Sequence, residues 1–356
     1  MAKVEAFLSL EKSISTTMTS VWSKVARSVI EKVQPLLEAR RWDDAHDIAN
    51  RLTLNGVVEV HRKRLEELAV STLLFGAQNV TGSPRETSFV KGKQALPWAM
   101  QQALDQLTDI VEVNGAELVR NQLHAIIRRH EIGVTKAELK KDDIFDELEE
   151  GVFGTGRTAI DIAANLTASR LATLGFLSEA IINSIETYQI SEVLDDRTCP
   201  VCLYMHGKTF DVHQEYSRVL TALGTMDPKE LKSLAPWPSQ TLKGLQSLNA
   251  MSREELQAAG FGSPPFHPNC RGVLVLVGTV TEEIPLGELL IARRLAPVTS
   301  TRLSLDIVPP GELRDRIKEI DDQERQQILL LAFLAGGAAA VEELLDEEDG
   351  TSGDNP

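Results

Sequence analysis

The stretch DDRTCPVCLYMHG, residues 195–207, decides how this chain is expected to fold. A second stretch, PPFHPNCRG at residues 264–272, lies far along the chain and also contains cysteine. The chain has 356 residues and only three cysteines, and all three fall in these two stretches, as Cys199, Cys202 and Cys270. This concentration indicates that the cysteines share one chemical role.

The spacing of these residues is typical of a structural metal site. A Cys-x-x-Cys turn presents two thiolates to one tetrahedral ion, and a His-x-x-Cys turn can supply the other two corners. Proline in both turns stiffens the backbone that presents the ligands. The sequence therefore predicts a Cys3His zinc site made of Cys199, Cys202, His267 and Cys270. Such a closed site leaves no position for water, which favours a structural role over a catalytic one.

Residues 203–266 separate the two turns, and other interpretations stay open. Closing a loop of this length costs about 4 kcal/mol, whereas structural zinc contributes on the order of 10 kcal/mol. His206 is an alternative fourth ligand because it follows Cys202 closely. The competing interpretations are three unrelated buried cysteines or a redox Cys-x-x-Cys, which lacks a thioredoxin-like context here. Disulfides are rare in the cytosol, and three cysteines cannot all pair within one chain.

Composition indicates a helical globular protein. Hydrophobic residues make up 42% of the chain, charged residues 25% and aromatic residues 5%. Abundant alanine and leucine favour helix over strand. The formal net charge of −15 repels polyanions, which argues against general coating of nucleic acid. Short basic runs, such as residues 61–64, are more typical of the solvated side of a helix.

The predicted fold is α+β and predominantly α-helical. Apolar residues at helical spacing, including Ile30 and Val33, predict helices in the first part of the chain. TYQISEVL (187–194) and RGVLVLVGTV (271–280) predict strands, the second buried on both faces. The predicted divisions are an N-terminal helical region at 1–78, a linker at 79–97, a helical region at 98–150, a small α+β module stapled by zinc at 151–280 with a helical insertion at 221–263, and C-terminal helices with an acidic disordered tail at 281–356.

The insertion contains two signals for the start of a helix. Asp227 is the expected N-cap of one helix, with Pro228 at its first position, and Ser252 and Glu255 predict a capping box at the start of another.

The glycine-rich run GVFGTGRTAI, residues 151–160, invites comparison with nucleotide-binding loops. Its glycine spacing fits neither the dinucleotide nor the P-loop fingerprint, and an acidic segment precedes it in place of a buried strand. We therefore expect a loop that enters the next helix. Apolar residues from Ile160 to Ile185 are expected to line one side of that helix.

Neither end of the chain predicts a membrane segment. The N-terminus carries Glu5 and Glu11 and lacks the apolar run of a secretion signal. The longest apolar stretch, residues 328–341, would reach roughly 21 Å as a helix, short of the ~30 Å hydrocarbon core. We expect no contact with membranes and a cytoplasmic location.

The two cysteine stretches together resemble the phage head morphogenesis family, the minor head proteins of the phage Mu F-like type. The resemblance covers about residues 150–280. The residues that match the family pattern are Asp196, Arg197, Thr198, Cys199, Cys202, Gly207, Lys208, Phe210, Pro264, Pro265, His267, Pro268, Asn269, Cys270 and Arg271. There are two departures from the family pattern. Leu166-Thr167-Ala168 replaces an Arg-Thr-Glu of the preceding helix, and His206 replaces an acidic residue.

This resemblance implies a minor phage head (capsid) protein that acts at the portal vertex in head morphogenesis, genome packaging or delivery. Its partners would be the portal protein and other head proteins, it could form an oligomer at the portal vertex, and it would be found in the virion head and host cytoplasm. The helical N-terminal region is the candidate portal contact, because amphipathic helices dock into grooves. Arg197 and Arg271 flank the metal turns and are candidate partner contacts, unless each pairs with Asp195, Asp196 or a turn carbonyl.

Two other classes of function remain open. One is an enzyme. Some family members are joined to ADP-ribosyltransferase-like modules, and a zinc-dependent nuclease would need an open metal site with a base such as His206 or His213. The other is a DNA-binding internal head protein, whose affinity would fall steeply with salt. The sequence contains no convincing catalytic cluster, so we expect a structural protein and not an enzyme.

Overall fold

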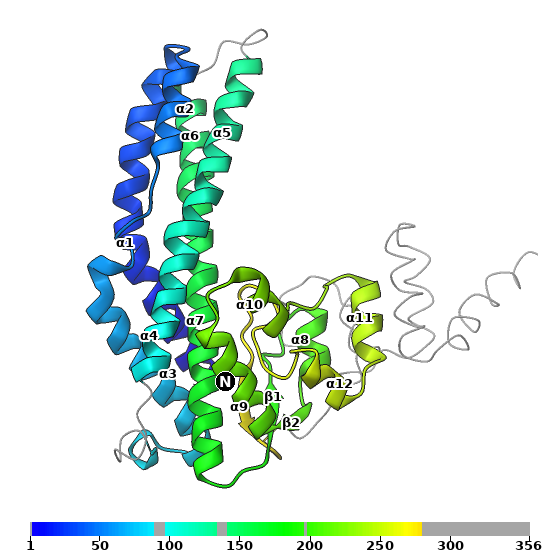
Figure 1. Cartoon of the computed structure of the whole chain (residues 1–356). Helices are drawn as coiled ribbons and strands as arrows, with labels where there is room; N and C mark the ends of the chain where they lie inside the picture. The colour runs from blue at the N-terminus through cyan, green and yellow to red at the C-terminus, as the bar shows by residue number, and fades with distance from the viewer. Residues whose placement is uncertain (1, 89–96, 134–140, 196–197, 280–356) are drawn as a thin grey trace, which may run out of the picture.

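A long helical stalk carries a smaller α+β module on its side (Figure 1). The computed structural model describes residues 2–88, 97–133, 141–195 and 198–279. The stalk helices are α1 (Ala2–Glu38), α2 (Trp42–Arg51), α3 (Arg62–Thr81), α4 (Pro97–Thr108), α5 (Ala116–Gly133), α6 (Lys141–Leu148) and α7 (Thr155–Ile182). Two short 3-10 helices, Glu59–His61 and Pro84–Glu86, and two π-helices, Asp109–Gly115 and Glu149–Gly154, complete the stalk. The prediction of a predominantly helical protein is confirmed.

Helix α1 shows why this part of the chain folds as it does. Its buried side chains recur every three or four residues, which places them on one side of the helix. They are Phe7, Ile14, Met18, Trp22, Ala26, Ile30, Val33 and Leu37. This side packs mainly against α7 and α3. The turn after α2 uses Gly56, whose φ of +83° lies in the left-handed region that glycine tolerates best.

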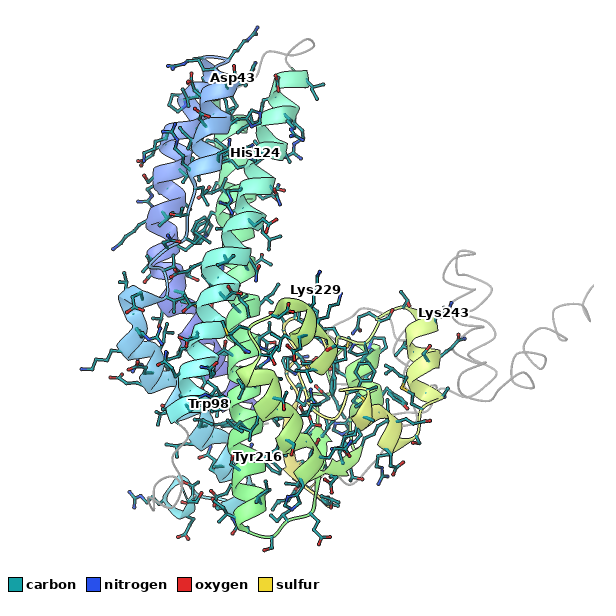
Figure 2. The ribbon with its side chains drawn as sticks, viewed as in Figure 1. Asp43, Trp98, His124, Tyr216, Lys229 and Lys243 are labelled. Atoms are coloured by element: carbon teal, nitrogen blue, oxygen red, sulfur yellow. The ribbon has the colours of Figure 1, made fainter. Side chains whose placement is uncertain are left out.

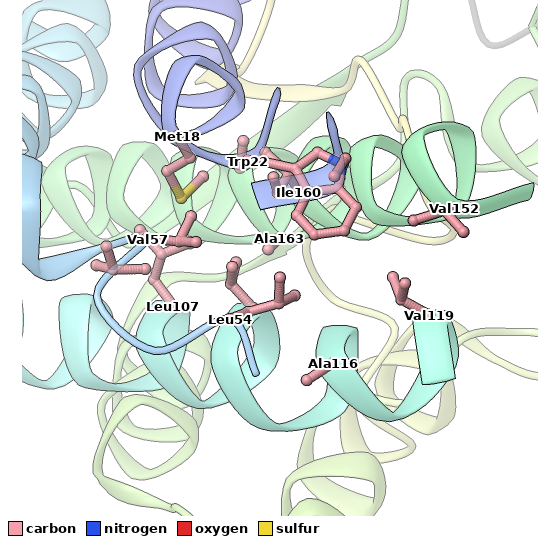
Figure 3. Close-up of a cluster of buried hydrophobic side chains, with 14 of the residues drawn as sticks. Met18, Trp22, Leu54, Val57, Leu107, Ala116, Val119, Val152, Ile160 and Ala163 are labelled. Atoms are coloured by element: carbon pink, nitrogen blue, oxygen red, sulfur yellow. The ribbon is translucent and has the colours of Figure 1, made fainter. Parts of the chain in front are cut away.

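Figure 3 shows the centre of the stalk core, where Trp22 of α1 lies beside Ile160 and Ala163 of α7. The Trp22 ring also covers Gly156, where an added Cβ would lie 2.2 Å from a ring carbon. Trp22 Nε1 donates a hydrogen bond to the Phe153 carbonyl at 3.0 Å. The tryptophan can be buried here because both its ring and its N–H find partners.

The prediction of a loop at residues 151–160 is wrong. These residues continue from α6 through the second π-helix into α7 without leaving helical structure. The glycines serve close packing, since a Cβ at Gly151 would lie 2.5 Å from Ile126 Cδ1. Gly154 has ordinary helical angles, with φ −62° and ψ −44°. In the sequence these glycines look like turn signals, because the sequence does not show which side chains of other helices pack against them.

Helix α7 is buried on nearly every side between Ala163 and Ala180. The sequence predicts a single apolar side, but the helix separates two cores. Its first half packs in the stalk core with Ile160 and Ala168, and its second half packs in the module core with Leu174 and Phe176. A helix enclosed in this way needs apolar residues all round.

The module contains a three-stranded antiparallel sheet with the order β2-β1-β3. The strands are β1 (Thr187–Ser191), β2 (Thr209–Asp211) and β3 (Val273–Leu276), and Tyr188 pairs with both Phe210 and Leu276. The predicted burial of the last strand on both faces is confirmed. Val273 and Val275 belong to the stalk core, whereas Leu274 points into the module core. Alternate residues of a strand face opposite sides, so β3 joins the two cores.

Short helices surround the sheet. They are α8 (Pro200–Met205), α9 (Val212–Gly224), α10 (Pro228–Leu234), α11 (Leu242–Asn249) and α12 (Arg253–Ala258). The predicted helical insertion at 221–263 contains α10 to α12 and the end of α9. Asp227 caps α10, and Ser252 and Glu255 form the expected capping box at α12. Figure 2 labels Lys229 on α10, near the stalk, and Lys243 on α11, on the side of the module away from the stalk.

Several predicted divisions can be placed on this fold. Helix α3 continues to Thr81, beyond the predicted boundary at 78, and the division at 150 falls inside a continuous helical run. The start of the predicted linker is held in place, because Ser88 donates its backbone N–H to Glu179 of α7 at 2.9 Å. Residues 89–96 and the predicted C-terminal region at 281–356 lie outside the described residues.

None of the described helices combines the length and the apolar character that crossing a membrane requires.

Candidate metal centre

The first cysteine turn is built by the start of α8. Cys199 is the N-cap of this helix, and its Sγ accepts the Cys202 backbone N–H at 3.3 Å. Pro200 stands at the first helical position, where a missing N–H costs nothing. Thr198 closes the loop before the helix by bonding to Val193 and by accepting the Asp195 N–H at 3.0 Å. One helical turn therefore places Cys199 and Cys202 on the same side of α8.

The second turn precedes β3. The Cys270 N–H donates to the His267 carbonyl at 3.2 Å, which folds the His-x-x-Cys segment back on itself. Asn269 adopts a left-handed conformation with φ +62°, which asparagine tolerates better than most residues. Asn165 of α7 donates its side-chain amide to the Cys270 carbonyl at 2.9 Å. This hydrogen bond fixes the turn against the stalk, and the sequence offered no signal for it.

The two turns converge, although 64 residues of chain (203–266) lie between Cys202 and His267. Cys202 Sγ lies 3.0 Å from His267 Nε2 and 3.7 Å from Cys270 Sγ. Sulfurs bound at about 2.3 Å to a tetrahedral ion lie about 3.8 Å apart, so the pair of cysteines already has ligand spacing. Cys199, Cys202 and His267 form one group whose donor atoms all lie within 4.8 Å of one another. A cysteine and histidine cluster within ion-binding distance is therefore present.

His267 is oriented for binding through Nε2. Its Nδ1 lies 2.6 Å from the Pro268 carbonyl oxygen. A carbonyl only accepts hydrogen bonds, so Nδ1 carries the proton and donates. In the neutral ring, Nε2 then holds the lone pair and faces Cys202. This backbone contact is the kind that fixes the tautomer and direction of metal-binding histidines.

Close thiols shift one another's pKa values. The hydrogen bond from Cys202 lowers the pKa of Cys199 to about 4 and raises the pKa of Cys202 itself. Burial acts to lower the pKa of His267, but its hydrogen bond with Cys199 and the nearby thiolate charge raise it to about 9. Without an ion, the cluster therefore favours a Cys199 thiolate beside a His267 imidazolium. Binding a metal displaces these protons.

Glu192 also contributes to the cluster, although it is not among the ligands predicted from the sequence. Its carboxyl Oε1 lies 3.8 Å from Cys270 Sγ, and Glu192, Cys202 and Cys270 form a second group with donor atoms within 4.8 Å. Burial is the main reason that its pKa is raised well above the usual value, and the neighbouring cysteine thiolates add to the shift. An acidic residue that directly follows a buried strand was the available signal.

His206, the alternative ligand, lies outside both donor groups. Its Nδ1 accepts the Glu192 backbone N–H at 3.0 Å, so the ring joins the end of α8 to the residue that follows β1. Burial lowers its pKa, which keeps the ring neutral and suited to accepting this bond. His213, the other candidate base, is exposed on α9.

Of the two arginines predicted to contact a partner, Arg271 is paired within the chain. Arg271 forms two parallel hydrogen bonds with Asp195, at 2.6 and 2.5 Å, and its side chain is largely buried. Pairing of Arg271 with Asp195 is the predicted alternative to a partner contact. It joins the turn that contains Cys270 to the loop before Cys199. Arg197 lies outside the described residues.

The cluster thus consists of two groups of three donors that share Cys202, and neither group contains all four ligands predicted from the sequence. Cys270 lies with Cys202 and Glu192, whereas Cys199 and His267 lie on the other side of Cys202. Two turns, a helix start and a strand end hold it in place at the junction of module and stalk. In comparisons with protein-family models, curated proteins and solved structures, no match to this chain was found.

Proposed function

We propose that Cys199, Cys202, His267 and Cys270 bind one zinc ion as a closed structural centre. The observation that carries this proposal is the convergence of the two turns, with Cys202 Sγ 3.7 Å from Cys270 Sγ. Thiolates and imidazole are the donors that zinc prefers, and structural sites use four of them in a tetrahedron. The ion replaces the protons of the cluster and holds the start of α8 against the start of β3.

Elemental analysis tests this directly. Protein purified from medium supplemented with zinc is expected to contain one zinc ion per chain, and dialysis against a strong chelator is expected to remove it. Cobalt substitution should produce the intense visible absorption of a tetrahedral thiolate site. Purified protein that binds no stoichiometric divalent metal under these conditions would contradict the proposal.

We further propose that the chain is a minor phage head protein with a structural, non-enzymatic role at the portal vertex. The support is the sequence pattern around the two turns, which resembles the phage head morphogenesis family across the module. The stalk would supply the arm that reaches the portal protein. Its free end exposes apolar side chains, with Ile132 76% exposed on α5 and Phe145 41% exposed on α6.

Co-purification with the portal protein of the same phage genome tests this role. Ile132→Asp and Phe145→Asp are expected to weaken recovery of the portal at least tenfold, because each places a charge on the apolar end of the stalk. Met226→Asp is the control, since Met226 is 45% exposed but belongs to the module. Removing residues 1–78 would be a poor test, because α1 and α3 cover much of α7. Equal recovery with all three variants would exclude the stalk end as the contact.

A direct assay distinguishes this role from an enzyme. Incubation with labelled NAD, or with DNA and divalent metal, is expected to produce no transfer of ADP-ribose and no cleavage. Either product would refute the non-enzymatic part of the proposal while leaving the zinc site intact.

A further inference from the structure

The donor groups of the metal centre overlap at a single atom. Cys199, Cys202 and His267 form one group, and Glu192, Cys202 and Cys270 form the other, so both use Cys202 Sγ. The groups differ in depth. Cys199 and His267 are partly exposed, whereas Glu192, Cys202 and Cys270 are all buried. An ion at Cys202 can therefore be held from either side, and the two groups together offer five donors, one more than a tetrahedral zinc can use.

The Glu192 carboxylate is at the spacing expected of a ligand. A carboxylate oxygen bound to zinc at about 2.0–2.2 Å lies about 3.5 Å from a sulfur on the neighbouring corner. The distance from Glu192 Oε1 to Cys270 Sγ is 3.8 Å. By this measure Glu192 is as close to its cysteine neighbour as the cysteines are to each other, at 3.7 Å.

Gly272 provides independent support. A Cβ at this position would lie 2.1 Å from Glu192 Oε1 and 2.7 Å from its Cδ. Gly272 is not among the glycines with positive φ, so its backbone does not require glycine. The absence of a side chain at residue 272 leaves the space in which the carboxylate reaches the cysteines.

The surroundings of Glu192 also call for a cation. The residue is only 6% exposed, so its ionised form is costly unless it is paired or bound to a metal, and without an ion burial raises its pKa and favours the protonated carboxyl. Arg271, the nearby arginine, donates two hydrogen bonds to Asp195. Within the described residues, no lysine or arginine forms a salt bridge with Glu192. A divalent ion at Cys202 would displace the Glu192 proton and balance the charge of the carboxylate.

We propose that Glu192 is a fifth donor of the metal centre, which alternates with His267 as the fourth ligand beside the three cysteines. This inference rests on the proposed zinc site and adds to it a second coordination of the same ion. With His267 the four ligands are three cysteines and a histidine. With Glu192 they are three cysteines and a glutamate, and the ion then lies on the buried side of Cys202. Both side chains already lie within 4.8 Å of Cys202 Sγ.

A double-mutant cycle on zinc affinity tests the exchange, with the full chain and a chromophoric chelator as competitor. Because the affinities of two alternating coordinations add, Glu192→Gln and His267→Gln are each expected to weaken zinc binding by only about 2-fold, since the other side chain keeps the fourth position. The double variant is expected to lose more than about 1,000-fold, well beyond the product of the single losses. Gly272→Ala keeps the carboxylate but displaces it, and should resemble Glu192→Gln.

Controls separate this result from general damage to the fold. Glu179→Gln removes another buried carboxylate, one that binds Ser88 far from the cysteines, and should leave zinc affinity unchanged. Far-UV circular dichroism of each zinc-loaded variant checks that it is folded. If Glu192→Gln binds zinc as tightly as the parent, or if the double variant matches His267→Gln alone, the inference is overturned. If the parent chain itself binds no zinc, the proposed metal centre fails first.

Discussion

Replacing Cys202 with serine is expected to abolish zinc binding and to unfold the module while most of the stalk stays helical. Cys202 belongs to both donor groups, so no other side chain can substitute for it. Structural zinc contributes on the order of 10 kcal/mol, which equals the whole stability of many domains, about 5–15 kcal/mol. Limited proteolysis should therefore cut the variant between residues 192 and 272 but leave the parent intact.

Two comparisons make this result specific to the metal. Met205→Leu changes a buried side chain of the same helix at nearly constant volume, so it should keep its zinc and its protease resistance. A chelator should make the parent protein resemble Cys202→Ser and should have no further effect on the variant itself. A variant that resists protease like the parent would show that the module does not depend on the ion.

Gly175→Ala is expected to destabilise the stalk by about 3 kcal/mol or more, near the top of the range for overpacked cores. Among the described elements, helices α3 and α7 make the most extensive contact, and glycines let their backbones meet. A Cβ at Gly175 would lie 2.1 Å from the Leu73 carbonyl oxygen, and one at Gly76 would lie 1.9 Å from that of Ala172. Backbone atoms cannot rotate away as a side chain can, so the helices must separate.

Chemical denaturation of the zinc-loaded protein measures this loss. Gly154→Ala is the matched control, because it adds the same methyl group to the same helical run but meets no atom within 4 Å. Since Gly154 has helical backbone angles, its replacement should stabilise the protein by about 0.5–1 kcal/mol. Equal stability of Gly175→Ala and the parent would mean that α3 and α7 do not touch through their backbones.

The local features of this fold could be predicted from the residues that make them. The helical spacing of Ile30 and Val33, the cap at Asp227 and the capping box at Ser252 each depend on neighbours within one turn of chain. The apolar run at residues 273–276 likewise marks β3. These predictions succeeded because the interactions that decide them are close in sequence.

The glycines and the acidic residues were harder to interpret. Gly151, Gly156 and Gly175 are one residue type in the sequence, yet each leaves room for a different atom of a distant element. Glu192 resembles any polar residue after a strand until the fold brings Cys202 and Cys270 beside it. Their roles depend on contacts between residues far apart in the chain, which local patterns do not encode.

The amino-acid sequence by itself determined the helical character of the chain, the capped starts of its short helices and the four cysteine and histidine residues of the predicted metal centre. Only the tertiary structure decided that α7 separates two cores, that Asn165 fixes the second metal turn and that Glu192 joins the donors. The physical reason is range. Backbone propensity and capping act between neighbours, whereas burial and metal coordination depend on which distant segments pack together.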